Sequence, residues 1–167
     1  MSDLYQEILV KRNTPVSDQI KKFGLIALTV FCFLGGLTIQ PWFLVAGLGM
    51  AVVCYFVVPR FDLEYEYLYV NGELDIDKIM NKQKRKRCAS YNIDQLEIIA
   101  PSNSGELDRF RRKQDIKIKD YTSLDPKVPS YTLVFNQDKG QELLKLELNQ
   151  AVVNDIRRTA PRKVVKD

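Results

Sequence analysis

The chain has 167 residues, enough for one compact domain and an anchor, and carries 25 basic and 21 acidic side chains for a net charge of +4. This balance lacks the large basic excess of a dedicated nucleic-acid-binding protein, so we predict no nucleic-acid partner. The sequence contains no histidine, the commonest general base and metal ligand, and its three cysteines form neither a disulfide framework nor a zinc motif. We therefore predict no metal site, no cofactor and no enzymatic activity.

The first predicted elements are two transmembrane helices. Residues 23–58 contain no charged side chain, and Gln40-Pro41 divides this stretch into the runs 23–39 and 42–58. Because an α-helix rises 1.5 Å per residue, each run spans roughly 25 Å, slightly less than the ~30 Å hydrocarbon core of a bilayer. Proline cannot continue a helix, so we place a tight turn at Pro41. A soluble helical hairpin is the alternative, but two helices that are apolar all round would need a larger partner to bury them.

Basic residues mark one side of this hairpin. Four of them precede it and one follows it, whereas the connecting turn has none. These residues are Lys11, Arg12, Lys21, Lys22 and Arg60. Since loops rich in lysine and arginine stay in the cytoplasm, we predict a protein with two membrane spans and both termini cytoplasmic. Residues 1–22 then form a cytoplasmic N-terminal segment.

Small side chains recur at four-residue spacing within both runs, at Cys32 and Gly36 in the first and at Gly47 and Ala51 in the second. This spacing permits close contact between membrane helices. Small residues are also common in any membrane helix, so the sequence leaves open whether these positions form a packing face.

After Pro59 the hydrophobic period changes from that of a helix to that of a strand. Apolar and acidic residues alternate strictly over residues 61–67. Asn71-Gly72 is a strong signal for a tight hairpin, which leads into a second alternating strand over residues 73–80. The sequence therefore predicts that a β-hairpin begins directly after the second helix.

The remaining chain predicts more strands and one closing helix. The further strands are expected at residues 88–100, 116–121, 131–135 and 142–148, the last two joined by a turn at 138–140. Asn149 can cap a helix over residues 150–159, in which Val152, Val153 and Ile156 form an apolar stripe. A cytoplasmic β domain is thus placed at residues 60–160, followed by a basic tail at 161–167.

This order of elements, short antiparallel strands followed by one amphipathic helix, resembles the small barrel of a pleckstrin-homology-like domain. The resemblance is carried by residues 65–79, with a strand, the Asn-Gly turn and a second strand, and by residues 85–99. The predicted fold class is α+β, with an N-terminal two-helix transmembrane hairpin followed by an antiparallel β-barrel-like (pleckstrin-homology-like) domain with a C-terminal helix.

The whole chain also resembles an uncharacterised family of short bacterial membrane proteins with two helices and a pleckstrin-homology-like cytoplasmic domain. Residues 9–12, 62–86 and 160–163 carry this resemblance. It implies a location in the bacterial cell membrane. The family has no assigned activity, so the resemblance implies no functional residue.

The candidate binding site is a run of five basic residues after the second predicted strand, namely Lys82, Lys84, Arg85, Lys86 and Arg87. Close to a bilayer such a cluster can attract anionic lipid headgroups, at about 1 kcal/mol per residue. The basic early turns of pleckstrin-homology-like domains are natural headgroup sites, so the resemblance favours this interpretation. The sequence leaves two alternatives open, a solvated turn or strand face and a contact with a protein partner.

Three other patterns have simpler explanations. Phe110 lies among basic residues at 109–113, which is better explained by a solvated loop than by nucleic-acid contacts. The carboxylates at 62–66 and 73–77 alternate with apolar residues, which places them on the outer face of a sheet rather than in a metal site. Cys88 follows the basic run, which could lower the pKa of its thiol, but a single thiol without histidine is more often inert.

Two functional hypotheses follow. The first is a noncatalytic, membrane-anchored binding or scaffold module at the cytoplasmic face, in contact with the lipid bilayer and with either anionic lipid headgroups or an unknown membrane or cytoplasmic protein. The second is a structural subunit of a larger membrane complex that assembles through the transmembrane hairpin. The anchor, the barrel-like strand pattern and the absence of catalytic residues favour the first hypothesis. The short distance between Val58 and the first β-strand limits the domain to events at the inner leaflet.

Overall fold

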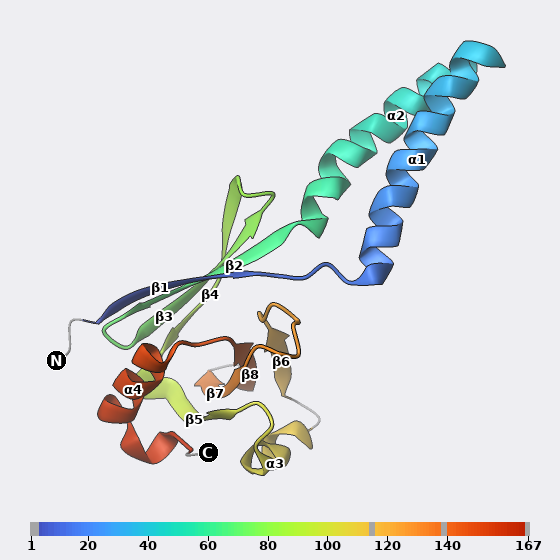
Figure 1. The fold of residues 1–167 in the computed structure, drawn as a ribbon. Helices are drawn as coiled ribbons and strands as arrows, with labels where there is room; N and C mark the ends of the chain where they lie inside the picture. The colour runs from blue at the N-terminus through green and yellow to red at the C-terminus, as the bar shows by residue number, and fades with distance from the viewer. Residues whose placement is uncertain (1–3, 114–115, 138–139, 166–167) are drawn as a thin grey trace. The chain divides into compact units, whose positions relative to one another are not determined.

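The computed structural model describes residues 4–113, 116–137 and 140–165 (Figure 1). These residues form two compact units. The helical unit consists of Asn13–Leu63 and Ile79–Lys84. The β unit consists of the described residues of Met1–Arg12, Glu64–Lys78 and Arg85–Asp167. Each unit is described below on its own terms.

The helical unit contains an antiparallel pair of helices, α1 (Val16–Thr38) and α2 (Trp42–Val57), which run side by side in Figure 1. A 3₁₀ turn, η1 (Val58–Phe61), continues α2. Both helices are long and apolar enough to cross a membrane, with a mean hydropathy of 1.7 for the first and 2.1 for the second. The described chain buries only 17% of the apolar segment of the first helix and 6% of that of the second. Most of these apolar side chains are therefore uncovered, as expected of helices that cross a membrane.

Small residues allow α1 and α2 to approach each other closely. A Cβ atom placed on Gly36 would lie 2.6 Å from the Leu44 side chain and 2.8 Å from its backbone nitrogen. A Cβ atom on Gly47 would lie 3.4 Å from the Phe33 ring and 3.5 Å from Cys32 Cβ. Gly36, Gly47 and Cys32 therefore lie on a packing face within the helical pair, whereas no such contact is shown for Ala51, the fourth small residue.

The foot of the helical pair is closed by hydrogen bonds between the two segments that enter and leave it. Thr14 Oγ1 donates to the Phe61 carbonyl oxygen over 2.9 Å. The backbone N–H of Asn81 donates to the Asp62 carbonyl oxygen, also over 2.9 Å, so a β-turn belongs to this unit as well. Asn81 and Lys82 have φ angles of 50° and 55°, the left-handed conformation that a tight hairpin turn requires.

Eight strands are present in the described residues. They are β1 (Tyr5–Lys11), β2 (Leu63–Val70), β3 (Glu73–Met80), β4 (Lys84–Asn92), β5 (Leu96–Pro101), β6 (Lys117–Asp120), β7 (Tyr131–Gln137) and β8 (Gly140–Leu146). The first sheet has the strand order β1-β2-β3-β4, and the second has the order β5-β7-β8-β6. The predicted Asn71-Gly72 turn joins β2 to β3, with Gly72 at a φ of +87°.

Short helices connect and close these sheets. They are the 3₁₀ turns η2 (Ile93–Gln95), η3 (Gly105–Leu107) and η4 (Pro161–Lys163), the single turn α3 (Asp108–Arg111) and the closing helix α4 (Gln150–Thr159). Helix α4 has the predicted bounds, and the Asn149 side chain accepts a hydrogen bond from the Val152 N–H over 2.9 Å, as expected of an N-cap.

Strand β1 is the main departure from the sequence prediction, which assigned residues 1–22 to a separate segment. β1 pairs antiparallel with β2 over its whole length, from Tyr5 opposite Val70 to Lys11 opposite Glu64. The helical pair is therefore an insertion between the first two strands of one sheet. Pairing across so long an insertion has no local signal in the sequence.

Two further differences concern the later strands. The single strand predicted over 88–100 is wrong, because η2 divides the segment into the end of β4 and β5. The Asn92 side chain accepts a hydrogen bond from the Asp94 N–H, which caps this turn. In addition, β6 pairs with β8 in parallel, so the second sheet is not entirely antiparallel. The hairpin of β7 and β8 is confirmed, although residues 138 and 139 of its predicted turn lie outside the described residues.

One core unites the two sheets and α4. Its largest fully buried side chains include Tyr67 and Tyr69 from the first sheet and Phe135 from the second. The predicted stripe of α4, with Val152, Val153 and Ile156, packs into this core. Two sheets and a helix around a shared core confirm the α+β prediction for this part of the chain, although the strands of the described residues form two open sheets rather than one closed barrel.

The predicted basic tail, 161–167, is ordered along β5 as far as it is described. Residue 164 bridges Ile99 in parallel, and the Val165 N–H donates to the Ile99 carbonyl oxygen over 2.9 Å. Residues 166 and 167 lie outside the described residues.

Candidate functional site

The structure divides the predicted basic run, Lys82–Arg87, into two parts that belong to different units. Every side chain of the run is exposed. Lys82 and Lys84 lie at the β-turn of the helical unit, whereas the residues from Arg85 onward belong to the β unit. The five basic residues therefore do not form one continuous patch within one unit.

The two arginines of the run bind carboxylates on neighbouring strands. The Arg85 guanidinium forms an ion pair with Glu66 on β2, and its Nε lies 3.7 Å from Asp77 Oδ2 on β3. The Arg87 guanidinium forms an ion pair with Asp75 on β3. The carboxylates of β3 and Glu66 of β2 thus share a charged sheet face that the arginines partly neutralise, but Glu64 and Glu66 are buried rather than solvent-exposed as predicted.

The titration of these carboxylates reflects their surroundings. The hydrogen bond from Arg87 lowers the pKa of Asp75 despite partial burial. Burial raises the pKa of Glu66, and a hydrogen bond with Glu7 raises it further, while the positive charge of Arg85 acts in the opposite direction. Arg85 and Arg87 are therefore engaged by the sheet itself and offer less of their charge to an external ligand.

The lysines of the run behave differently. Among the described residues, Lys82, Lys84 and Lys86 form no ion pair. The lysines are therefore the members of the run whose charge is available to a ligand.

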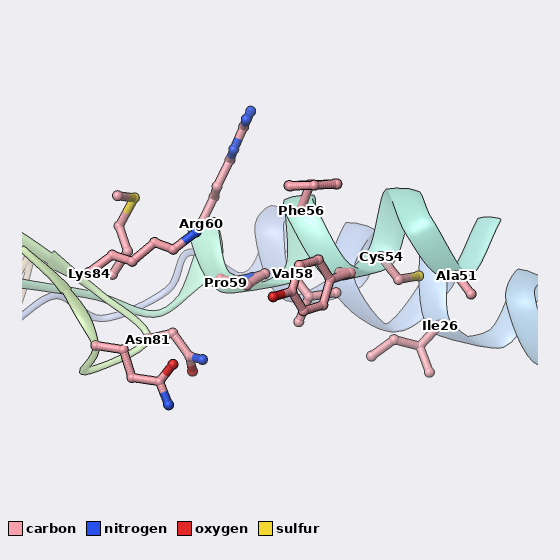
Figure 2. Close-up of a pocket in the computed structure, with 12 residues that line it drawn as sticks. Ile26, Ala51, Cys54, Phe56, Val58, Pro59, Arg60, Asn81 and Lys84 are labelled. Carbon is pink, nitrogen blue, oxygen red and sulfur yellow. The ribbon is translucent and has the colours of Figure 1, made fainter. Parts of the chain in front are cut away.

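Lys84 borders a groove of about 600 Å³ at the foot of the helical pair, which we call the foot groove. Its apolar wall includes Ile26 on α1 and Ala51 and Cys54 on α2, and continues through Val58. All residues that line the groove belong to the helical unit, and its volume is in the range of small-molecule sites. Figure 2 shows this wall along the helices, with the β-turn at the opposite end.

The other end of the foot groove is polar and positively charged. It is lined by Arg60, Asn81, Gln83 and Lys84, and no acidic residue takes part. In Figure 2 the Lys84 side chain reaches from the hairpin toward Pro59 and Arg60, while the Arg60 guanidinium points outward at the rim. Arg60, like Lys84, forms no ion pair within the described residues.

Sequence reasoning found Lys84 but missed the groove. Arg60 entered the prediction only as an orientation signal, and Asn81 was not singled out. The available signal was the change from a continuous apolar run to Pro59-Arg60. The approach of the β3–β4 turn to the end of α2 depends on contacts between distant segments, which the sequence pattern does not show.

The other candidate patterns take structural roles. Phe110 is 1% exposed and packs in a second small core, so its ring is not available for stacking on a base. Burial raises the pKa of the Cys88 thiol, the opposite of the effect considered from the basic run. Within the described residues, no group of three or more His, Cys, Asp or Glu side chains could hold a metal ion.

A partly buried polar cluster between β4, β6 and β8 was not predicted. The Tyr91 hydroxyl donates to Glu142 Oε2 over 2.7 Å, and Lys119 Nζ donates to the same oxygen over 2.8 Å. Burial acts to raise the pKa of Glu142, but the hydrogen bonds from Lys119 and Tyr91 outweigh it and the pKa is lowered. This cluster satisfies polar groups at the edge of the core, and we assign it to stability.

The comparisons with known proteins place the whole chain. The family model of a bacterial PH-like domain (DUF6106) matches residues 2–166. The chain belongs to this family. The match covers both apolar helices as well as the β unit, so the inserted helices are part of the region that defines this PH-like family. Neither the curated proteins nor the solved structures gave a match.

Proposed function

We propose that this PH-like protein is a noncatalytic binding module that α1 and α2 hold at the cytoplasmic face of the bacterial cell membrane, where it engages anionic lipid or a protein partner. The observation that carries the proposal is the insertion of two apolar helices between β1 and β2. The β unit is thereby joined to the helices at two points rather than one.

The two connections are short. The entering segment is residues 12–15, and the leaving segment is η1 with residue 62. The entering segment begins directly after Lys11, and the leaving segment ends close to Glu64. These two residues are opposite each other in the sheet. A domain attached in this way stays within reach of the membrane surface, which supports a role at the inner leaflet.

The orientation rests on basic residues. Lys11, Arg12, Lys21 and Lys22 precede the hydrophobic part of α1, and Arg60 follows α2, while the turn between the helices carries no charge. This distribution supports a cytoplasmic location for both ends of the helical pair.

The competing hypothesis is a structural subunit that assembles through the helices. Small residues are the usual contact points between membrane helices of different subunits. Here Gly36 and Gly47 already face the partner helix of the same chain. This use of the small residues favours a self-contained anchor over an assembly surface.

The test replaces the helical pair of the full-length protein by an unrelated two-helix anchor of the same orientation. We expect the partner proteins recovered in mild detergent, or the lipids that copurify, to remain attached to the β unit. Loss of every partner on replacement would support the subunit hypothesis. Neither a reproducible protein partner nor a lipid preference in the unmodified protein would contradict the proposed function.

A further inference from the structure

The foot groove has two chemically different halves within one unit. Its walls along α1 and α2 are apolar, and its end at the β-turn carries Arg60 and Lys84. Within the described residues neither cation has an acidic partner, and no carboxylate lines the groove. An occupant that complements this groove must join an apolar chain to an anionic group.

We propose that the foot groove binds one anionic phospholipid, with an acyl chain along Ile26, Ala51 and Cys54 and its phosphate between Arg60 and Lys84. This inference rests on the proposed function, because it requires that α1 and α2 lie in the membrane. It goes further by naming the ligand class and by assigning residues that the basic run alone did not identify.

The position of the cations along the helix supports this ligand. Arg60 follows the apolar stretch that ends at Val58, so in a membrane it would lie at the depth of the headgroups. Tyr55, which also lines the groove and is 73% exposed, is a residue type enriched at that depth. The groove therefore changes from charged to apolar at the depth where a phospholipid changes from headgroup to acyl chain.

The polar end also offers uncharged hydrogen-bond donors. Asn81 and Gln83 line the groove beside the two cations, and amide side chains can donate to phosphate or glycerol oxygens. The Asn81 backbone is fixed by its hydrogen bond to Asp62, so the turn that carries Lys84 is held at the foot of the helices. A held turn presents its cation without a large loss of conformational freedom on binding.

The test is native mass spectrometry of the full-length protein in detergent, titrated with phosphatidylglycerol and, in parallel, with zwitterionic phosphatidylcholine. We expect one tightly bound phosphatidylglycerol and weaker, nonselective binding of phosphatidylcholine. The double variant Arg60→Gln, Lys84→Gln should lower the preference for phosphatidylglycerol by about fivefold for each charge removed. The matched control is Arg112→Gln, Lys127→Gln, which removes two exposed charges of the β unit and should leave the preference unchanged.

A second pair of variants tests the apolar wall. Ala51→Phe should fill the groove and weaken binding of the lipid, whereas Val52→Phe, the next residue on α2 and one that does not line the groove, should not. Trp42 fluorescence, which reports on the helical unit, verifies that this unit remains folded in every variant.

Two results would overturn the inference. An anionic preference that survives both the double charge variant and Ala51→Phe would place the lipid elsewhere on the protein. Equal binding of the two lipids by the unmodified protein, or displacement of both by detergent alone, would show that the groove has no anionic-lipid selectivity. In either case the proposed function stands if the β unit still retains its protein partners after helix replacement, so the two failures are distinguishable.

Discussion

The two units of this chain treat apolar side chains in opposite ways. In the helical unit, Phe31 is 61% and Trp42 is 76% exposed, whereas in the β unit Leu133 and Phe135 are fully buried. The β unit therefore carries its own core, whereas most apolar side chains of the helical unit are left uncovered by the described chain. The comparison shows that the two units of one chain differ in whether they bury their own apolar side chains, and that this difference begins at the segments that join them.

The largest effect should come from removing a ring from the core of the β unit. Phe135→Ala deletes a fully buried side chain that stacks on Tyr91 with ring centroids 4.7 Å apart. We expect a loss of about 3–5 kcal/mol in the free energy of unfolding. Urea titration of the full chain in detergent, followed by the near-ultraviolet circular dichroism of the buried tyrosines, measures it.

The matched change in the helical unit is Phe31→Ala, because the Phe31 side chain is largely exposed. It should leave the transition of the β unit unchanged. Equal losses for the two variants would contradict the idea that the units have separate sources of stability.

A smaller effect should follow from crowding the helical pair. Gly36→Ala places a Cβ atom against the backbone of Leu44, where no side-chain rotation can relieve the contact. We expect the helices to separate locally, which should lower the stability of the helical unit by about 1–3 kcal/mol. In detergent, the thermal unfolding midpoint followed by Trp42 fluorescence should fall accordingly.

Gly49→Ala is the control for this variant, since nothing lies within 4 Å of the added atom. It should be neutral or slightly stabilising, because alanine is the better helix former. A loss of stability at Gly49 as large as that at Gly36 would argue against close packing as the cause.

The stability of the β unit, unlike that of the helical unit, should depend on the protonation of Glu142. The pKa of Glu142 is lowered in the folded β unit, so its charge contributes stability above the unfolded pKa of about 4.3 and loses that contribution as the pH falls through the folded value. Glu142→Gln should therefore cost about 1–3 kcal/mol at pH 7, and the difference from the unmodified protein should shrink below about pH 4.

Urea titrations between pH 3 and 7 measure this difference, with the exposed Glu106→Gln as the control. Since the carboxylate of Glu142 lies in the β unit, the fluorescence of Trp42 should not follow the same pH dependence. A constant difference at all pH values would remove Glu142 as the titrating group.

The smallest effect should come from a helix cap. Asn149→Ala removes the hydrogen bond accepted from the Val152 N–H and the one donated to Gln6 Oε1, and should cost about 1 kcal/mol of β-unit stability. Asn154→Ala, at an exposed position inside α4, should cost nothing, and the same urea titration compares the two. If both variants were equally unstable, the cap would not be the cause.

Those parts of the fold that depend on neighbouring residues could be predicted from the sequence. The uncharged run predicts the helical pair, Asn71-Gly72 predicts the β2–β3 turn, and Asn149 predicts the start of α4. In each case the signal and the structure lie within a few residues of each other. The resemblance of the sequence to a PH-like family is confirmed by the family model.

The parts that depend on distant segments could not be predicted. β1 has its partner on the far side of the helical insertion, and β6 joins β8 in parallel without any local mark. The start of β4 was missed because Lys84–Arg87 has no apolar alternation, and its strand is stabilised instead by carboxylates on β2 and β3. The foot groove was missed for the same reason, since its charged end and its apolar wall come from separate segments.

The insertion of α1 and α2 between β1 and β2 also orders events during synthesis. β1 leaves the ribosome first, but its neighbour in the sheet is made only after both helices. If a single helix crossed the bilayer, the two strands would end on opposite faces and Lys11 could never lie beside Glu64. If α1 and α2 cross a membrane, the first sheet can therefore be completed only when both helices have crossed it.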